Sequence, residues 1–313
     1  MLDNYFTSLT SFVARDNTSA DDDLNPYGYT PSFAVGILFM TLFGISTFTH
    51  FCQAIAYRKW FFLYTAVFAG LIELAGWYGR VWSSKNVDNA DAFTIQIVCT
   101  IVAPTPLLAA NFIILARIIR KLGDSYSRLR PRRYSRIFVT CDIIALFVQA
   151  GGGSVASGTN ISQSQVNTGS NIMLGGIGFQ VGVMLCYMAL ATEYFWRFSR
   201  QRPVRCSTEG ENKTGVIDHR LQLLIYALMF NTACLFIRAI YRTIELSYGF
   251  NGKVIRTQWL FCFFDATMVA FAMYTLNIAH PGRLLDENDK NSPTQTKGLS
   301  SSTELSPTNF VKV

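Results

Sequence analysis

Seven charged side chains and one amide interrupt stretches of sequence that are otherwise apolar. An acid in such a setting can hold an ammonium group or carry a proton, and an arginine can hold a phosphate or neutralise a surplus acid. Because a charge inside a membrane-spanning segment is costly, each of these side chains is a candidate for a functional role. The eight candidates are Glu73, Arg80, Asp142, Gln149, Arg238, Arg242, Glu245 and Asp265.

The spacing of these residues places them on shared helix faces. Glu73 and Arg80 are seven residues apart, and so are Asp142 and Gln149, a separation that returns to the same side of an α-helix. We therefore predict that all eight residues line one polar cavity, which accepts an amphipathic ligand. The competing interpretation is a set of salt bridges between helices that only fixes their packing.

Long apolar segments must position these side chains. Half of the chain is hydrophobic and only 15% is charged, whereas soluble domains carry roughly 25% charged residues. A span needs about 20 mostly apolar residues. We predict an all-α integral membrane bundle of seven transmembrane helices, over 33–56, 60–82, 93–116, 136–156, 169–195, 220–246 and 257–279. The cavity would then lie among the second, fourth, sixth and seventh of these spans.

The basic residues between the spans predict the orientation of the bundle. Twenty lysines and arginines fall in the segments on one side of the membrane and four in the segments on the other. Because basic loops stay in the cytosol, we expect the N-terminus outside and the C-terminus inside. The net charge of +7 does not indicate nucleic-acid binding, since these residues lie in short loops between apolar runs.

Three regions follow from this topology. We expect an extracytosolic segment over 1–32, a transmembrane domain over 33–282 and a disordered cytosolic tail over 283–313, which is rich in serine, threonine and asparagine. Asn17 and Asn160 begin glycosylation sequons that fall outside. We predict that either asparagine can carry glycan.

Prolines and glycines mark candidate hinges in two spans. Pro104 and Pro106 interrupt the third span, and each removes a backbone hydrogen bond and bends the helix. Gly151, Gly152 and Gly153 end the fourth span, where they permit local unwinding or a close approach of a neighbouring helix. The competing interpretation for these glycines is packing alone.

Residues for catalysis are scarce. The chain has three histidines, no clustered His and acid residues with metal-ligand spacing, and no Walker pattern for nucleotide binding. The cysteines lie in apolar segments and one basic loop, so no disulfide framework is expected. We predict a protein that is not an enzyme and needs no metal and no cofactor.

Several stretches together resemble the fungal lipid-translocating exporter family, also called RTA-like proteins. Any one motif is weak, but their order and spacing extend over the whole membrane core. The matching stretches are Tyr29–Ser32, Glu73–Arg80, Ala103-Pro104, Ala109-Ala110, Arg117, Phe138, Asp142, Gln149–Gly153, Gly175, Gln180, Arg238–Arg242, Glu245, Gly249, Gly252, Phe264–Ala266 and His280–Gly282.

The resemblance implies a multi-pass protein of the plasma membrane, or of an endomembrane, that moves lipids such as sphingoid long-chain bases. It also implies protection against toxic amphiphiles. The expected partners are then membrane lipids or amphiphilic small molecules, and no oligomeric state is implied.

Two other classes remain open on the residues alone. A seven-helix receptor-like sensor of lipid or membrane stress has the same topology, although the Asp-Arg-Tyr and Asn-Pro-x-x-Tyr marks of the common receptors are absent. A membrane hydrolase would need clustered histidines and acids for zinc, and the low histidine count argues against it.

Overall fold

The computed structural model describes residues 29–87, 89–156, 163–204, 217–247, 254 and 257–290. These residues form helices joined by short turns and contain no strand. The described residues do not include Asn17, Asn160 or the segments 1–28 and 291–313. The glycosylation, the extracytosolic N-terminal segment and the disorder of the last residues therefore stay predictions.

The first half of the chain forms five helical elements that follow the predicted spans. Helix α2 covers Phe33–Ala56, the bounds expected for the first span. A π-helical turn, η1 (Leu63–Val67), runs directly into α3 (Phe68–Ser83). Helix α4 (Ala90–Val102) is followed at once by α5 (Pro104–Leu122).

The second half contains the longest helices and a second π-helical turn. A short 3-10 turn, η2 (Asp124–Tyr126), precedes α6 (Pro131–Ala156) and α7 (Gln163–Ser199). Helix α8 spans His219–Ser247. The final segment consists of α9 (Gln258–Phe261), η3 (Cys262–Thr267), α10 (Met268–Ile278) and α11 (Pro281–Lys290).

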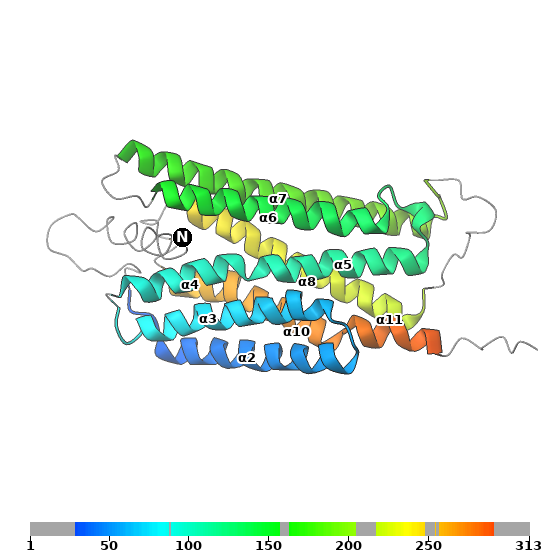
Figure 1. The fold of residues 1–313 in the computed structure, drawn as a ribbon, viewed down its shortest axis with the longest axis horizontal. Helices are drawn as coiled ribbons and strands as arrows, with labels where there is room; N and C mark the ends of the chain where they lie inside the picture. Colours follow the sequence, from blue (N-terminus) through cyan, green and yellow to red (C-terminus); the bar gives the residue numbers. More distant parts are fainter. Residues whose placement is uncertain are drawn as a thin grey trace, which may run out of the picture.

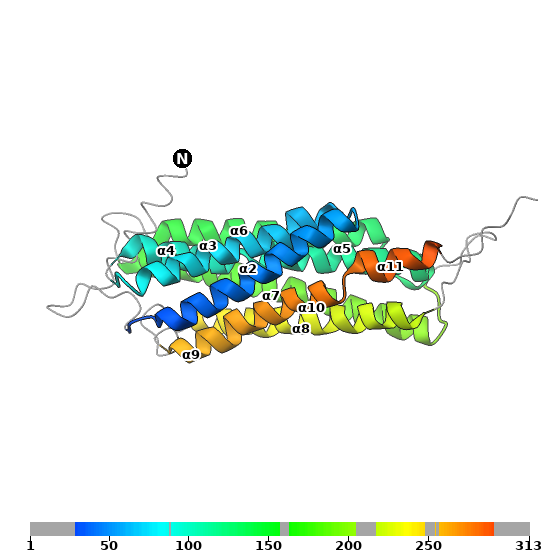
Figure 2. The ribbon, with the colours of Figure 1, turned by 90° about the horizontal axis from the view of Figure 1, so that it is seen from below.

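The helices run along the long axis of one bundle (Figures 1 and 2). Helices α6 and α7 pair along one edge, α2 and α3 lie toward the opposite edge, and α8 crosses the bundle obliquely (Figure 1). Among the described residues, six helical segments are long and apolar enough to cross a membrane. Large apolar side chains cover the outside, with Phe147 75% exposed and Phe48 69% exposed, as expected of a surface that faces lipid.

The predicted break in the third span is present. Helix α4 ends at Val102 and α5 begins at Pro104, with Ala103 between them. Because Pro104 has no N–H, the backbone ladder is interrupted at this point.

The three glycines of α6 do not unwind it, since the helix continues to Ala156. At Gly152 the backbone of α7 is so close that an added Cβ would lie 2.6 Å from the Met173 nitrogen. The close-approach interpretation therefore holds at Gly152, whereas nothing lies within 4 Å of a Cβ built on Gly151.

The tail expected to be disordered from 283 begins instead with helix α11. Leu284 and Leu285 are buried where α11 packs against α8. The Lys121 ammonium also donates to the Leu285 carbonyl oxygen at 2.6 Å. The polar composition of the segment concealed these two leucines, whose burial stabilises one further helix after the bend at Pro281.

Candidate functional site

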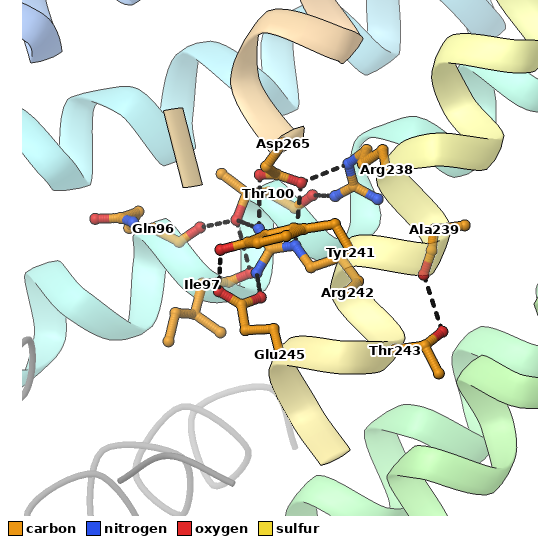
Figure 3. Close-up of polar contacts among 10 residues, drawn as sticks. All are labelled: Gln96, Ile97, Thr100, Arg238, Ala239, Tyr241, Arg242, Thr243, Glu245 and Asp265. Carbon is orange, nitrogen blue, oxygen red and sulfur yellow. Dashed lines mark hydrogen bonds and ion pairs between the residues drawn. The ribbon is translucent and has the colours of Figure 1, made fainter. Parts of the chain in front are cut away.

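Two arginines and two acids form a buried salt-bridge cluster between α8 and η3 (Figure 3). The Arg242 guanidinium contacts both oxygens of Asp265, from Nε at 3.0 Å and from Nη2 at 2.7 Å. Arg242 Nη1 also donates to Glu245 Oε2 at 2.8 Å, and Arg238 Nε lies 2.7 Å from Asp265 Oδ1. Two positive and two negative charges therefore neutralise one another inside the bundle.

Uncharged groups complete this salt-bridge cluster. Thr100 of α4 accepts hydrogen bonds from both arginines, through its hydroxyl from Arg242 at 3.0 Å and through its carbonyl oxygen from Arg238. The Tyr241 hydroxyl donates to Glu245 Oε1 at 3.0 Å. The cluster thus connects α4, α8 and η3, which are far apart in the sequence.

Local backbone geometry brings the acids to the arginines. On α8 the three charged residues are four and three positions apart, so Arg238, Arg242 and Glu245 share a face. Asp265 lies in the π-helical turn, where the Thr267 hydroxyl donates to the Cys262 carbonyl five residues back at 2.8 Å. The π-helical turn inserts an extra residue and changes the direction in which Asp265 points.

Glycines on α3 seat this helix against α4. A Cβ on Gly79 would lie 2.7 Å from the Ala92 carbonyl oxygen, and one on Gly76 would lie 3.1 Å from Thr100 Cγ2. This close packing brings the predicted face of α3, with buried Glu73 and Arg80, beside the salt-bridge cluster.

Arg80 lies at one end of the cluster and shares an aromatic ring with it. The Phe261 ring is 4.9 Å from the Arg80 guanidinium carbon and 5.3 Å from that of Arg242. Arg80 Nη2 donates to the Tyr29 hydroxyl at 2.9 Å, and burial raises the pKa of Tyr29. Arg80 and Arg242 thus both contact the ring of Phe261.

Glu73 is buried in the same region, with 2% of its surface exposed. Asp265, Arg238 and Arg242 lie within electrostatic range of its carboxyl group. No arginine or lysine of the described residues comes within salt-bridge distance of it. Glu73 therefore adds an acid whose charge only more distant groups compensate.

Asp142 lies apart from the salt-bridge cluster, on α6. Only 1% of its surface is exposed, and neither carboxyl oxygen has a hydrogen-bond partner among the described residues. The amide of Gln180 on α7 lies near it. No salt bridge to Asp142 is present among the described residues, and a buried acid without a cationic partner is costly, so Asp142 is the acid of this bundle best suited to receive a cationic ligand.

A polar relay links α5, α6 and α7 close to Asp142; we use this name for Gln149, Gln180 and Thr105. Gln149 Nε2 donates to Gln180 Oε1 at 3.2 Å, and Gln180 Nε2 donates to Thr105 Oγ1 at 3.4 Å. The relay gives the bundle a second polar region that carries amides and a hydroxyl in place of paired charges.

A small cavity of about 40 Å³ lies between this relay and the salt-bridge cluster. It has polar groups on both sides, apolar walls on α7 and α8, and the proline of the α4–α5 break beside it. Its lining residues are Ile101, Pro104, Leu108, Gln149, Ile177, Gln180, Val181, Met184, Leu235, Arg238, Ala239, Arg242 and Leu246. The space suits one or a few water molecules, so a lipid head group would enter only if the helices separated.

The structure therefore separates the eight predicted residues, with Asp142, on α6, apart from the other charged ones. All eight are buried, but only Gln149, Arg238 and Arg242 line the cavity. Glu245 and Asp265 are turned into salt bridges, and Glu73 and Arg80 lie behind them on α3. The cavity lies among α4 to α8, which differs from the second, fourth, sixth and seventh spans that were expected.

Apart from Gln149, the uncharged members of the site were not predicted from the sequence. Thr100, Thr105 and Tyr241 are ordinary residues for a membrane helix, and no spacing rule distinguishes them. Gln180 carried a usable signal, because an amide in an apolar run is itself costly to bury. Phe261 gave no signal, since aromatic residues are common throughout this chain.

Comparisons with known proteins give one consistent result. A family described as RTA1 like protein matches residues 66–288. The sphingoid long-chain base transporter RSB1 of Saccharomyces cerevisiae is 30% identical over 300 residues, covering 88% of this chain and 78% of the relative. The probable lipid transporter atnI of Emericella nidulans is 28% identical over 274 residues, covering 86% and 70%.

A third relative, Protein RTA1 of Saccharomyces cerevisiae, is 23% identical over 294 residues, covering 84% of this chain and 86% of the relative. No solved structure matches the chain. The matched region contains all eight candidate residues, the polar relay and the cavity.

Proposed function

The chain belongs to the RTA1-like protein family, and from that premise we propose that it exports sphingoid long-chain bases or related amphiphiles across a membrane. The protein is a multi-pass membrane protein. Two of its relatives carry the names of a sphingoid long-chain base transporter and a probable lipid transporter. We place it in the plasma membrane, where export of such molecules would protect the cell from toxic amphiphiles.

The observation that supports the proposed mechanism best is the buried carboxyl group of Asp142, which has no salt-bridge partner among the described residues. A long-chain base carries an ammonium group, hydroxyl groups and one apolar tail. The ammonium would bind Asp142, since a charge-assisted contact offsets the cost of burying both charges. The acids of the salt-bridge cluster are already engaged by arginines and are less available.

The apolar wall of the cavity suits the tail. Ile177, Val181 and Met184 of α7 face Leu235 and Ala239 of α8 across the space. A tail between these helices would keep contact with the bilayer while the head group crosses. Because the cavity holds only about 40 Å³, passage requires α7 and α8 to separate. We propose that the segment formed by α4 and α5, which also lines the cavity, bends at the break before Pro104 during this opening.

We further propose seven spans, with the N-terminus outside and the C-terminus in the cytosol. The turn η1 has 5 residues and continues into the 16 residues of α3. At 1.5 Å per residue this segment is about 30 Å long, which matches the hydrocarbon thickness of a bilayer. Together with the six long apolar segments, it would bring the number of spans to seven. An odd number of spans places the two termini on opposite sides of the membrane, as the distribution of the basic residues predicts.

A proteoliposome assay tests the proposed function. Purified protein is reconstituted, a labelled long-chain base is added to one side, and its appearance on the other side is followed against empty vesicles. We expect the protein to accelerate transfer clearly above the rate in empty vesicles. Saturable binding of the base without any acceleration would contradict export and indicate the receptor-like sensor instead.

A further inference from the structure

The polar relay carries more hydrogen-bonding capacity than its own bonds use. A primary amide offers two donors and two lone pairs, and a hydroxyl offers one donor and two lone pairs. The two bonds of the relay, at 3.2 and 3.4 Å, use one donor from each glutamine. Both bonds are long, so exchanging them for bonds to a ligand loses little.

The packing around the relay keeps these groups at the cavity. A Cβ on Gly176 would lie 2.8 Å from the Gln149 Cγ atom, so the glycine of α7 leaves room for this side chain of α6. Gln149 and Gln180 both line the cavity, and Thr105 follows the break at Pro104 directly. The relay thus brings together neutral groups from three helices at the helix break.

The relay also lies next to the proposed site of the ammonium group. Gln180 is near the carboxyl group of Asp142 and within hydrogen-bond distance of both Gln149 and Thr105. The opposite wall carries Arg238 and Arg242, which already engage the acids of the salt-bridge cluster, so the carboxyl group that is free of salt bridges among the described residues lies on the Asp142 side. Groups attached to carbons beside the ammonium would then meet Gln180 first.

We propose that the polar relay of Gln149, Gln180 and Thr105 binds the hydroxyl groups beside the ammonium and selects long-chain bases by their number of hydroxyls. This inference rests on the proposed function. Neutral amides exchange hydrogen bonds with hydroxyls and add no charge to the site. A hydroxyl that reaches the unused donors and lone pairs of the relay gains hydrogen bonds that an analogue without this hydroxyl does not make.

The test compares two long-chain bases that differ by one hydroxyl on carbon 4 in the proteoliposome assay. Wild-type protein should transport the more hydroxylated base about five- to tenfold faster, the effect of one ordinary hydrogen bond. Gln149→Met and Gln180→Met keep the length of the side chain and remove its hydrogen bonds. Each variant should bring the ratio of the two rates close to one while still transporting the less hydroxylated base.

Gln222→Met is the matched control, because Gln222 is an exposed amide of α8 that donates to the Tyr226 hydroxyl at 3.2 Å. It should keep the wild-type ratio. A ratio that stays at the wild-type value in Gln149→Met and Gln180→Met overturns the inference, even if both rates fall together. Wild-type protein that transports neither base contradicts the proposed function itself.

Where a glutamine variant does not fold, two further measurements decide. Thr105→Val removes the third hydroxyl-binding group with almost no change in volume, and it should reduce the rate ratio in the same way. Binding of the two bases to detergent-purified protein should show the same five- to tenfold preference, and the variants should lose it. Equal affinities in wild-type protein would overturn the inference.

Discussion

Replacing Asp265 with asparagine tests how far the salt-bridge cluster stabilises the bundle. The substitution keeps the shape of the side chain and removes a charge that three guanidinium nitrogens contact, at 2.7, 3.0 and 2.7 Å. Among the described residues, Arg238 then loses its salt bridge, and Arg242 keeps one salt bridge, to Glu245. Removing one partner of a buried pair leaves an uncompensated charge, so we expect the free energy of unfolding to fall by about 3–5 kcal/mol.

The chain offers a matched control for this substitution. Glu193 also accepts two guanidinium contacts, from Arg128 and Arg197, both at 2.7 Å. Its side chain is 24% exposed and that of Arg128 is 57% exposed, so Glu193→Gln should lower the free energy of unfolding by only about 0–1 kcal/mol.

Unfolding of detergent-purified protein, followed by tryptophan fluorescence during denaturant titration, measures both variants. The double variant Arg238→Gln with Asp265→Asn removes one charge of each sign. It should be less destabilised than the sum of its single variants by at least about 1 kcal/mol. A loss for Asp265→Asn no larger than for Glu193→Gln, or strict additivity in the double variant, would refute the reasoning.

Three further predictions concern the orientation, helix packing and C-terminal segment. A tag on the N-terminus should be accessible outside the cell, and endoglycosidase should remove glycan from Asn17 or Asn160; protection of both termini in the cytosol would contradict seven spans. Gly79→Val should destabilise the fold by at least about 1–3 kcal/mol, because its side chain would meet the α4 backbone, whereas Gly178→Val has free space and should lower thermal stability far less. A truncation after Leu285 should keep export, whereas Leu284→Ala should lower the free energy of unfolding by about 2–5 kcal/mol. Loss of export in the truncated protein, or a Leu284→Ala variant as stable as wild type, would contradict the role assigned to α11.

The positions of the helices were largely predictable because apolar length is a strong signal. The first span coincides with α2, and the break at Pro104 follows from the missing N–H of proline. Helix α7 begins at Gln163, before the expected start at 169. Polar residues can extend a helix into water, and hydropathy detects only its apolar part.

The grouping of the charges was not predictable from spacing. Periodicity identifies the face of a helix, and it correctly placed Glu73 and Arg80 on one buried face. It does not specify which helix lies opposite, and the π-helical turn around Asp265 adds a residue that no sequence pattern indicated. Four charges therefore neutralise one another, while Asp142 is left beside the amide of Gln180.

The most direct test of the account is whether Asp142 holds the ammonium group of the lipid. Transport of a long-chain base and of its neutral N-acetyl analogue is compared in proteoliposomes for wild-type protein, Asp142→Asn and Asp91→Asn, an exposed acid at the start of α4. One charge-assisted contact corresponds to a roughly 10- to 100-fold preference for the cationic base. We expect Asp142→Asn to lose this preference and Asp91→Asn to keep it. A folded Asp142→Asn protein that still prefers the cationic base by the wild-type factor would contradict the account.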